Sequence, residues 1–359
     1  MLFLSRKRIS WLDASRGISI LMVVFCHSFV SNLKEQYGYF VVSEILPVVF
    51  MPTMFFVSGW AFELGVKKYE NNKLKSIGNK FMRLMIPYFV FSVLFYVVIF
   101  TATKIPALSS IANMGGTDFS EISLMDSVFQ ILFYQDSVCT SLWFLYTLFI
   151  YNVLNILFPK VMKHPVTIVI LLGLPFLQSA FGDSMPDLLF RVLTYPSYFS
   201  LGRVAVHLGD KLFEKNKLRF ALVTIIFTVS AIITFSLYFN GVFRGNMKYL
   251  FVTIRLILGL ISLYIVRVGC SFIENTKLDK MLSYCGVNSM AIYLIHFPFI
   301  TQVSSILALR ILPNSLSFFA CIIGTVLGVA IPLILSKYII TKVPILNTLL
   351  LGAPLKKRA

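Results

Sequence analysis

The chain has 359 residues, of which 58% are hydrophobic, 15% aromatic and only 13% charged. A soluble globular domain carries about 25% charged and 45–50% apolar residues, so the composition excludes that class and indicates a protein that crosses a membrane several times. The net charge of +17 comes from basic residues scattered between apolar segments, which argues against nucleic-acid binding.

Ten apolar segments are long enough, at about 17–25 residues, to cross a bilayer as helices. They lie near residues 15–33, 40–62, 84–103, 141–158, 165–181, 188–206, 218–239, 249–268, 284–307 and 316–338. We therefore expect an all-α membrane protein with about ten transmembrane helices. We expect one integral-membrane domain over residues 1–359, without a fused C-terminal domain.

The lysines and arginines predict how these helices are oriented, because positively charged loops are retained in the cytoplasm. With a cytoplasmic N-terminus, 23 of the 32 basic residues fall on the cytoplasmic side, 6 on the other side and 3 inside helices. The three inside helices are Arg16, Arg203 and Arg255. Both termini are therefore predicted to be cytoplasmic.

The longest predicted external loop, near residues 104–140, contains four acidic residues. These are Asp118, Glu121, Asp126 and Asp136. Loops of this length are often functional, so we expect either a lid or acceptor-facing surface, or simply a solvated connector.

The first predicted helix, WLDASRGISILMVVFCHSFV, contains Asp13, Arg16 and His27 in or just before an apolar run. Arg16 and His27 are eleven residues apart, which is about 16 Å along a helix and on one face, with Asp13 near that face. Ionisable groups are rare in membrane helices and mark functional sites by default. His27 is predicted to act as a general base or nucleophile, or else to pack as a histidine bonded to a neighbouring helix.

Arg16 lies near the predicted cytoplasmic end of this helix. It is placed to bind a phosphate or carboxylate of a substrate that enters from the cytosol. Alternatively, it extends to the lipid headgroups or pairs with Asp13. Arg83, in KFMRLMIPY, lies at the same predicted face, so the two arginines either clamp a polyphosphate together or Arg83 is a positive-inside anchor.

Further positions have both a structural and a functional interpretation. Ser58–Gly59 in the second predicted helix indicates either close helix approach or a broken helix end. His296 supports catalysis or makes a structural hydrogen bond, and Trp143 occupies an outer interfacial position. Arg255 lies inside the eighth predicted helix and needs a partner.

Several known signatures are missing from the sequence. It contains no P-loop, no GxSxG elbow, no GxGxxG and no metal-ligand spacing of His or Cys. The predicted helices contain few carboxylates, with Glu44 the main one. A proton-driven pump would usually contain more.

Several short motifs, taken in chain order, resemble those of a known protein family. Asp13–Arg16–Gly17 followed by His27 is similar to the opening signature of the acyltransferase type 3 family of integral-membrane O-acyltransferases. The segments FMPTMFFVSGW (50–60), RLMIPY (83–88), LWFL (142–145) and IYLIH (292–296) follow in the family's order. The FMP-x-x-FF-x-SG form resembles the branch described as fucose 4-O-acetylase-related.

The resemblance implies an O-acetyltransferase of the bacterial inner (plasma) membrane. It would move an acyl group, usually from acetyl-CoA, to a hydroxyl of a cell-surface glycan or of its lipid-linked precursor, with no bound cofactor. The expected site residues are the catalytic His27, Arg16 and Asp13, the acyl-CoA-binding Arg16, Arg83, Lys80 and Ser58, and the supporting His296 and Trp143. Lys80 stands where family members often carry Arg, which weakens that assignment.

Two other functions fit the same composition. A transporter or flippase of a lipid-linked glycan would move its substrate without consuming CoA, and it gives no reason for the spacing of Arg16 and His27. A non-catalytic membrane scaffold would tolerate apolar residues in place of the polar stripe.

Overall fold

The computed structural model describes residues 9–104, 124–134 and 140–354, and the elements within these ranges are helices, with no strand. The prediction of an all-α protein is therefore confirmed. The count of about ten transmembrane helices and the cytoplasmic position of both termini stay predictions.

The chain divides into two compact units, and the expectation of one domain over residues 1–359 stays a prediction. The first unit consists of Met1–Gly65, Lys163–Ser179 and Tyr195–Ser336, and the second of Val66–Met162, Ala180–Thr194 and Lys337–Ala359. All or most of the following helices belong to the first unit: α1 (Ser10–Ser28), α2 (Ser31–Lys34), α3 (Tyr37–Glu63), α9 (Pro165–Phe181), α11 (Pro196–Leu208), α12 (Lys217–Phe239), α13 (Met247–Phe272), α14 (Lys277–Val287), α15 (Ser289–Ile295), α16 (Thr301–Ile311) and α17 (Ser317–Tyr338). The second unit contains α4 (Val66–Asn71), α5 (Lys73–Thr103), α7 (Leu124–Phe133), α8 (Trp143–Leu157), α10 (Asp187–Thr194) and α18 (Pro344–Leu351).

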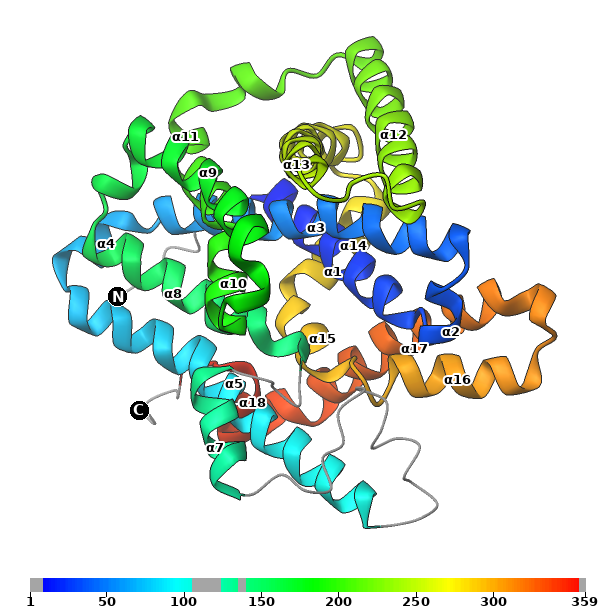
Figure 1. Cartoon of the computed structure of the whole chain (residues 1–359). Helices are drawn as coiled ribbons and strands as arrows, with labels where there is room; N and C mark the ends of the chain where they lie inside the picture. The colour runs from blue at the N-terminus through cyan, green and yellow to red at the C-terminus, as the bar shows by residue number, and fades with distance from the viewer. Residues whose placement is uncertain (1–8, 105–123, 135–139, 355–359) are drawn as a thin grey trace. The chain divides into compact units, whose positions relative to one another are not determined.

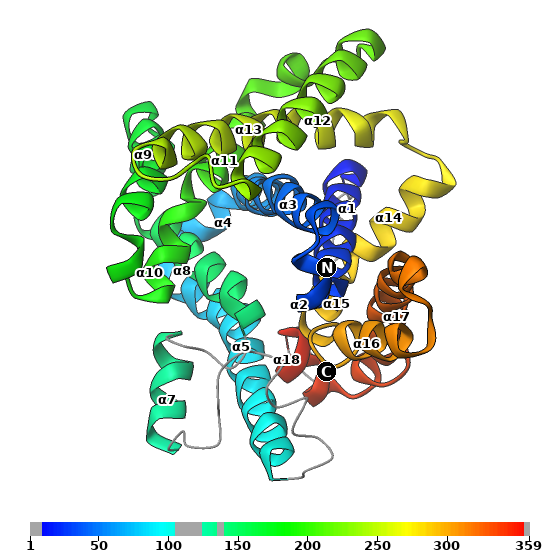
Figure 2. The same cartoon turned by 45° about the vertical axis from the view of Figure 1, so that its right-hand side comes forward.

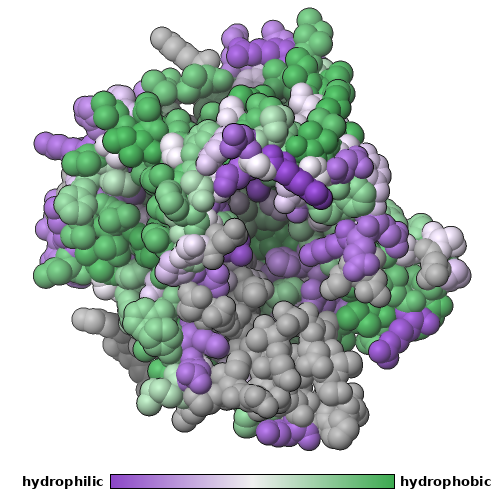
Figure 3. Space-filling view, viewed as in Figure 1, coloured by the Kyte–Doolittle hydropathy of each residue, from purple (hydrophilic) through white to green (hydrophobic). Residues whose placement is uncertain are grey.

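Five of the described helices, α3, α5, α12, α13 and α17, are long and apolar enough to cross a membrane. Leu222, Ile226 and Val229 of α12 are exposed, and hydrophobic atoms cover much of the face drawn in Figure 3. Apolar side chains directed outward over whole helices are typical of lipid-facing surfaces. The length and the exposed apolar side chains of these helices therefore support the interpretation that the chain is a membrane protein.

Helix α1 packs between α3 and α14 in the first unit, as Figure 1 and Figure 2 both show. Glycines bring α1 and α14 into backbone contact. A Cβ at Gly17 would overlap the carbonyl oxygen of Leu282, and a Cβ at Gly286 would overlap that of Asp13. Small residues allow membrane helices to approach this closely. The crossing fixes α14, and therefore the start of α15, against α1.

A second crossing of the same kind joins α3 to α11. A Cβ at Gly59 would overlap the carbonyl oxygen of Phe199, and a Cβ at Gly202 would overlap that of Phe56. The prediction of close helix approach at Ser58–Gly59 is thus confirmed. The alternative of a broken helix end is wrong, because α3 continues to Glu63.

In the second unit, α5 packs against α8 and α18. The left-handed Gly352 ends α18 directly against the backbone of Arg83 on α5. The Tyr151 hydroxyl donates a hydrogen bond to the Val192 carbonyl oxygen at 2.7 Å, which ties α8 to α10. Lys80 and Arg83 therefore lie on a helix that packs against two others of the second unit.

Three predicted spans are interrupted, so their continuous helices were wrong. Residues 15–33 are divided between α1 and α2, with extended backbone at Phe29 and Val30. Residues 188–206 form α10 and α11, with Pro196 as the first residue of α11. Residues 284–307 include the end of α14, all of α15 and the start of α16, with Pro298 between the last two. Proline lacks a backbone N–H and suits the start of a helix rather than its interior. His296 therefore ends a short helix instead of lying within a long one.

Most of the predicted external loop near 104–140 lies outside the described residues. Asp118, Glu121 and Asp136 are among the residues that are not described. Asp126 lies on α7. The choice between a lid and a connector stays open for this loop.

Gly17→Ala should destabilise the protein, because the new methyl group would overlap the Leu282 carbonyl oxygen and force α1 away from α14. Overpacking costs about 1–3 kcal/mol, so we expect a clear drop in the melting temperature of the detergent-purified protein. Gly173→Ala on α9 is the control, since nothing lies within 4 Å of a Cβ there. Equal melting temperatures for Gly17→Ala and the wild type would contradict the backbone contact.

Candidate functional site

Asp13, Arg16 and His27 lie on α1, and all three are half-buried. Their neighbours Ala14 and Ile20 are fully buried. Arg16 Nη1 lies 3.2 Å from Asp13 Oδ1, so the two residues form an ion pair within one helical turn. The predicted pairing of Arg16 with Asp13 is confirmed. His27, the last residue but one of α1, lies about 16 Å further along the helix axis.

His296 is fully buried at the end of α15. Its Nδ1 lies 2.8 Å from the Ile292 carbonyl oxygen and 2.9 Å from that of Tyr293. A carbonyl oxygen only accepts hydrogen bonds, so Nδ1 carries the proton and Nε2 keeps a lone pair. Nε2 is buried without a hydrogen-bond partner among the described residues. Buried polar atoms are rarely left unpaired, which makes this lone pair a candidate for a functional role.

The structure brings His27 and His296 together, as their positions on α1 and α15 allow. The ring centroids are 5.4 Å apart, with an angle of 57° between the ring planes. Phe297 covers His27 on another side, at a centroid distance of 4.5 Å. The two imidazoles therefore form a histidine pair whose buried member offers a hydrogen-bond acceptor.

The other predicted site residue of the first unit is Ser58. Its hydroxyl donates a hydrogen bond to the Met54 carbonyl oxygen at 2.7 Å, one turn earlier on α3. Such a bond uses the hydroxyl proton and leaves only the oxygen lone pairs for a ligand.

The remaining predicted site residues belong to the second unit. Lys80 Nζ lies 4.9 Å from the centroid of the Tyr69 ring, and Arg83, one turn further on α5, is exposed. Trp143 is largely buried at the start of α8, with the Arg191 guanidinium 5.3 Å from its ring. The prediction that Arg16 and Arg83 form one clamp stays a prediction, since each is described within its own unit.

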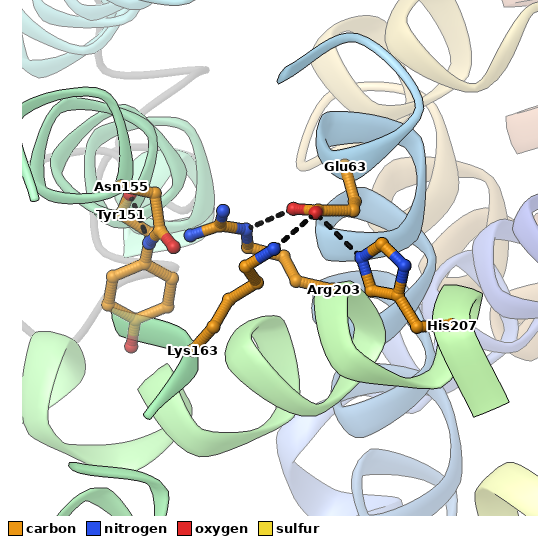
Figure 4. Close-up of polar contacts among 6 residues, drawn as sticks. All are labelled: Glu63, Tyr151, Asn155, Lys163, Arg203 and His207. Carbon is orange, nitrogen blue, oxygen red and sulfur yellow. Dashed lines mark hydrogen bonds and ion pairs between the residues drawn. The ribbon is translucent and has the colours of Figure 1, made fainter. Parts of the chain in front are cut away.

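A charged cluster that the sequence analysis missed surrounds Glu63, at the end of α3. Lys163 Nζ donates to Oε1 at 2.6 Å, Arg203 Nε donates to Oε2 at 2.8 Å, and His207 Nε2 lies 2.8 Å from Oε1. Figure 4 shows the three nitrogen-bearing side chains converging on this carboxylate. Glu63 and Arg203 are both buried, so each neutralises a charge that would otherwise be costly away from water.

The sequence contained a signal for this cluster. Glu63 directly follows the predicted span 40–62, and Arg203 is one of three basic residues inside predicted helices. An acidic and a basic residue at apolar positions need a partner each. Arg255 is the other arginine inside a predicted helix for which the sequence offered no partner. Its guanidinium lies over the Phe251 ring, 5.5 Å from the centroid, which is a cation–π contact.

Comparison with family models finds one match that covers most of the chain. A model described as an acyltransferase domain, of acyltransferase type 3, matches residues 9–336. These residues include α1, α3, α14, α15 and the histidine pair. No curated protein and no solved structure matches the chain.

Glu63→Gln should destabilise the protein strongly, because it breaks the ion pair between two buried side chains, Glu63 and Arg203. Removing one partner of a buried pair costs about 3–5 kcal/mol, measurable as a loss of unfolding free energy in an SDS titration. Glu274→Gln is the matched control, since Lys215 and Glu274 lie 3.6 Å apart with both side chains 52% exposed. Exposed pairs contribute about 0–1 kcal/mol. Equal losses for the two variants would contradict the importance of the buried cluster.

Proposed function

This chain belongs to the acyltransferase type 3 family, and from that premise we propose a membrane O-acyltransferase that uses acetyl-CoA and acetylates a glycan. Family membership and the apolar helices support a membrane acyltransferase. The finer proposal is that the acetyl group moves from cytosolic acetyl-CoA to a hydroxyl of a cell-surface glycan or its lipid-linked precursor. We place the protein in the bacterial inner membrane.

The observation that carries the proposal is the histidine pair. In the proposed reaction, His27 takes the proton of the acceptor hydroxyl while the hydroxyl oxygen attacks the thioester carbonyl carbon. A new C–O bond replaces the C–S bond, and the proton passes from His27 to the departing CoA sulfur. A positioned general base of this kind accelerates a reaction by about 10²–10⁴-fold. A variant of the mechanism has His27 carry the acetyl group between the two substrates.

His296 has a defined part in this scheme. Its Nδ1–H is held by two backbone carbonyl oxygens, so its ring orientation and its tautomer are fixed. The lone pair on Nε2 then accepts a hydrogen bond from His27 once His27 has taken the proton. A fixed acceptor stabilises developing positive charge without reorganisation, which is how buried dipoles lower a barrier.

In this proposal, Arg16 binds the acetyl donor, acetyl-CoA. Its ion pair with Asp13 orients the guanidinium near the start of α1, where it would bind a phosphate group of acetyl-CoA. The distance of about 16 Å along α1 to His27 is on the scale of an extended pantetheine arm. We propose that Ser58 contributes to acyl-CoA binding in the first unit, and that Arg83 and Lys80, with Trp143 in support, are acyl-CoA-binding residues of the second unit.

His27→Ala should abolish CoA release from acetyl-CoA by the purified protein, with a loss of about 10²-fold or more. Arg16→Ala should raise the KM for acetyl-CoA, because it removes a phosphate-binding group. His164→Ala is the control, since His164 is an exposed histidine in the same unit. Full activity of His27→Ala would rule out the proposed mechanism. No CoA release by the wild type, even with envelope glycan extract added, would favour the transporter.

Two substitutions of His296 separate its catalytic from its structural part. Asn places a nitrogen near the position of Nδ1 and removes Nε2, whereas Gln extends a polar atom toward the position of Nε2. We expect His296→Asn to lower kcat by about tenfold or more, with the KM for acetyl-CoA unchanged, and His296→Gln to recover part of that loss. Unchanged kcat for a stably folded His296→Asn would leave this residue a structural role only.

A further inference from the structure

A groove of about 410 Å³ lies where the start of α3 meets the connection between α12 and α13. The residues that line it are Phe40, Tyr238, Phe239, Gly241, Phe243 and Arg244. Four of the six are aromatic, and one is a cation. Ligand sites are typically lined by apolar and aromatic side chains with a few well-placed polar groups.

The aromatic walls of the groove are themselves packed. Tyr238 stacks on Phe251, with ring centroids 4.5 Å apart and planes 6° from parallel, and Phe40 stacks near its other side at 5.9 Å. Phe239 packs on Phe40 at 5.1 Å and stays 41% exposed. Rings fixed by their neighbours present a flat surface without losing side-chain freedom on binding.

Arg244 is held beside these rings by the turn that precedes α13. Gly241 has φ +72°, and a Cβ at this position would lie 2.9 Å from Nε and Nη2 of Arg244. The guanidinium thus rests against the glycine. No ion pair involves Arg244 in the part of the chain that the structure describes. A positioned, exposed guanidinium without a carboxylate partner is available to an anionic ligand.

The groove lies at the same end of the first unit's helices as His27. Cys26, beside His27, donates a hydrogen bond to the Ser43 carbonyl oxygen at 3.7 Å, and the Ser43 hydroxyl donates to the Phe40 carbonyl oxygen at 2.8 Å. Two contacts therefore connect the end of α1 to a groove wall. The loop charges predict that this end faces outward, where a surface glycan would be found.

We propose that this groove binds the acceptor, a glycan that bears a carboxylate or phosphate. The C–H face of a sugar ring would stack on Phe239, which is 41% exposed, because aromatic faces are electron-rich and attract weakly positive hydrogens. The anionic substituent would pair with Arg244. The inference deepens the proposed function and rests on it for the acceptor role. A lipid headgroup is less favoured because it would use the arginine but not the exposed ring of Phe239.

The test uses cellobiouronic acid, an anionic disaccharide, beside its neutral counterpart cellobiose, with the detergent-purified protein and isothermal titration calorimetry. The wild type should bind the anionic disaccharide more tightly. Arg244→Gln should weaken binding of the anionic disaccharide by about tenfold, the value of one charge-assisted contact, and leave cellobiose unaffected. Phe239→Leu should weaken binding of both, because it removes a ring face and keeps the hydrophobic volume.

Lys248→Gln is the matched control, since Lys248 lies in the next helix turn, over the Tyr249 ring, and does not line the groove. It should bind both disaccharides like the wild type. Equal affinity of the wild type for the two disaccharides, or an unchanged affinity of Arg244→Gln, would overturn the proposal. So would absence of sugar binding together with loss of co-purified anionic phospholipid in Arg244→Gln, which would make the groove a headgroup site.

CoA release by the same wild-type preparation separates the two proposals. CoA release without disaccharide binding would contradict the proposal that the groove binds the acceptor, and would leave the proposed acyltransferase function standing. Disaccharide binding without CoA release keeps a saccharide site and counts against the proposed function.

Discussion

The backbone contact between α1 and α14 is the constraint on which the candidate site depends. Where Gly17 and Gly286 cross, no side chain separates the two helices, so the crossing has almost no freedom to slide or widen. Helix α1 carries His27, and α14 leads into α15, which His296 directly follows. A small shift at the crossing would therefore change the spacing of the two imidazoles. Gly17, which directly follows Arg16, is required at its position because any side chain there would overlap the backbone of α14.

The first unit handles buried polar groups in two opposite ways. Around Glu63, the buried carboxylate meets the buried Arg203 guanidinium at 2.8 Å, and this ion pair joins α3 to α11. At His296, one ring nitrogen is bonded twice to the backbone while the other is left with an open lone pair. The second arrangement costs stability unless something else uses the lone pair. This contrast agrees with our proposal that the chemistry occurs at the histidine pair and not at the charged cluster.

Local patterns predicted much of this fold. The segments 165–181 and 218–239 agree with α9 and α12 to within one residue, because each is an apolar run with clear ends. The common face of Arg16 and His27 follows from helix geometry alone. The pairing of Glu63 with Arg203 could not be read in this way, since the two residues are 140 positions apart and no local period connects them. The interruptions near residues 29, 195 and 296 were missed because the apolar character continues across them, although Pro196 and Pro298 accompany the last two.

The partners of the α1–α14 crossing are far apart in the order of synthesis. Ser10 and Asp279, which are hydrogen-bonded beside this crossing, are 269 residues apart. Helix α1 is made first, yet its glycine face stays uncovered until α14 has been synthesised. An unfinished chain therefore displays a surface that the complete protein hides. The histidine pair likewise exists only in molecules whose synthesis has passed residue 296.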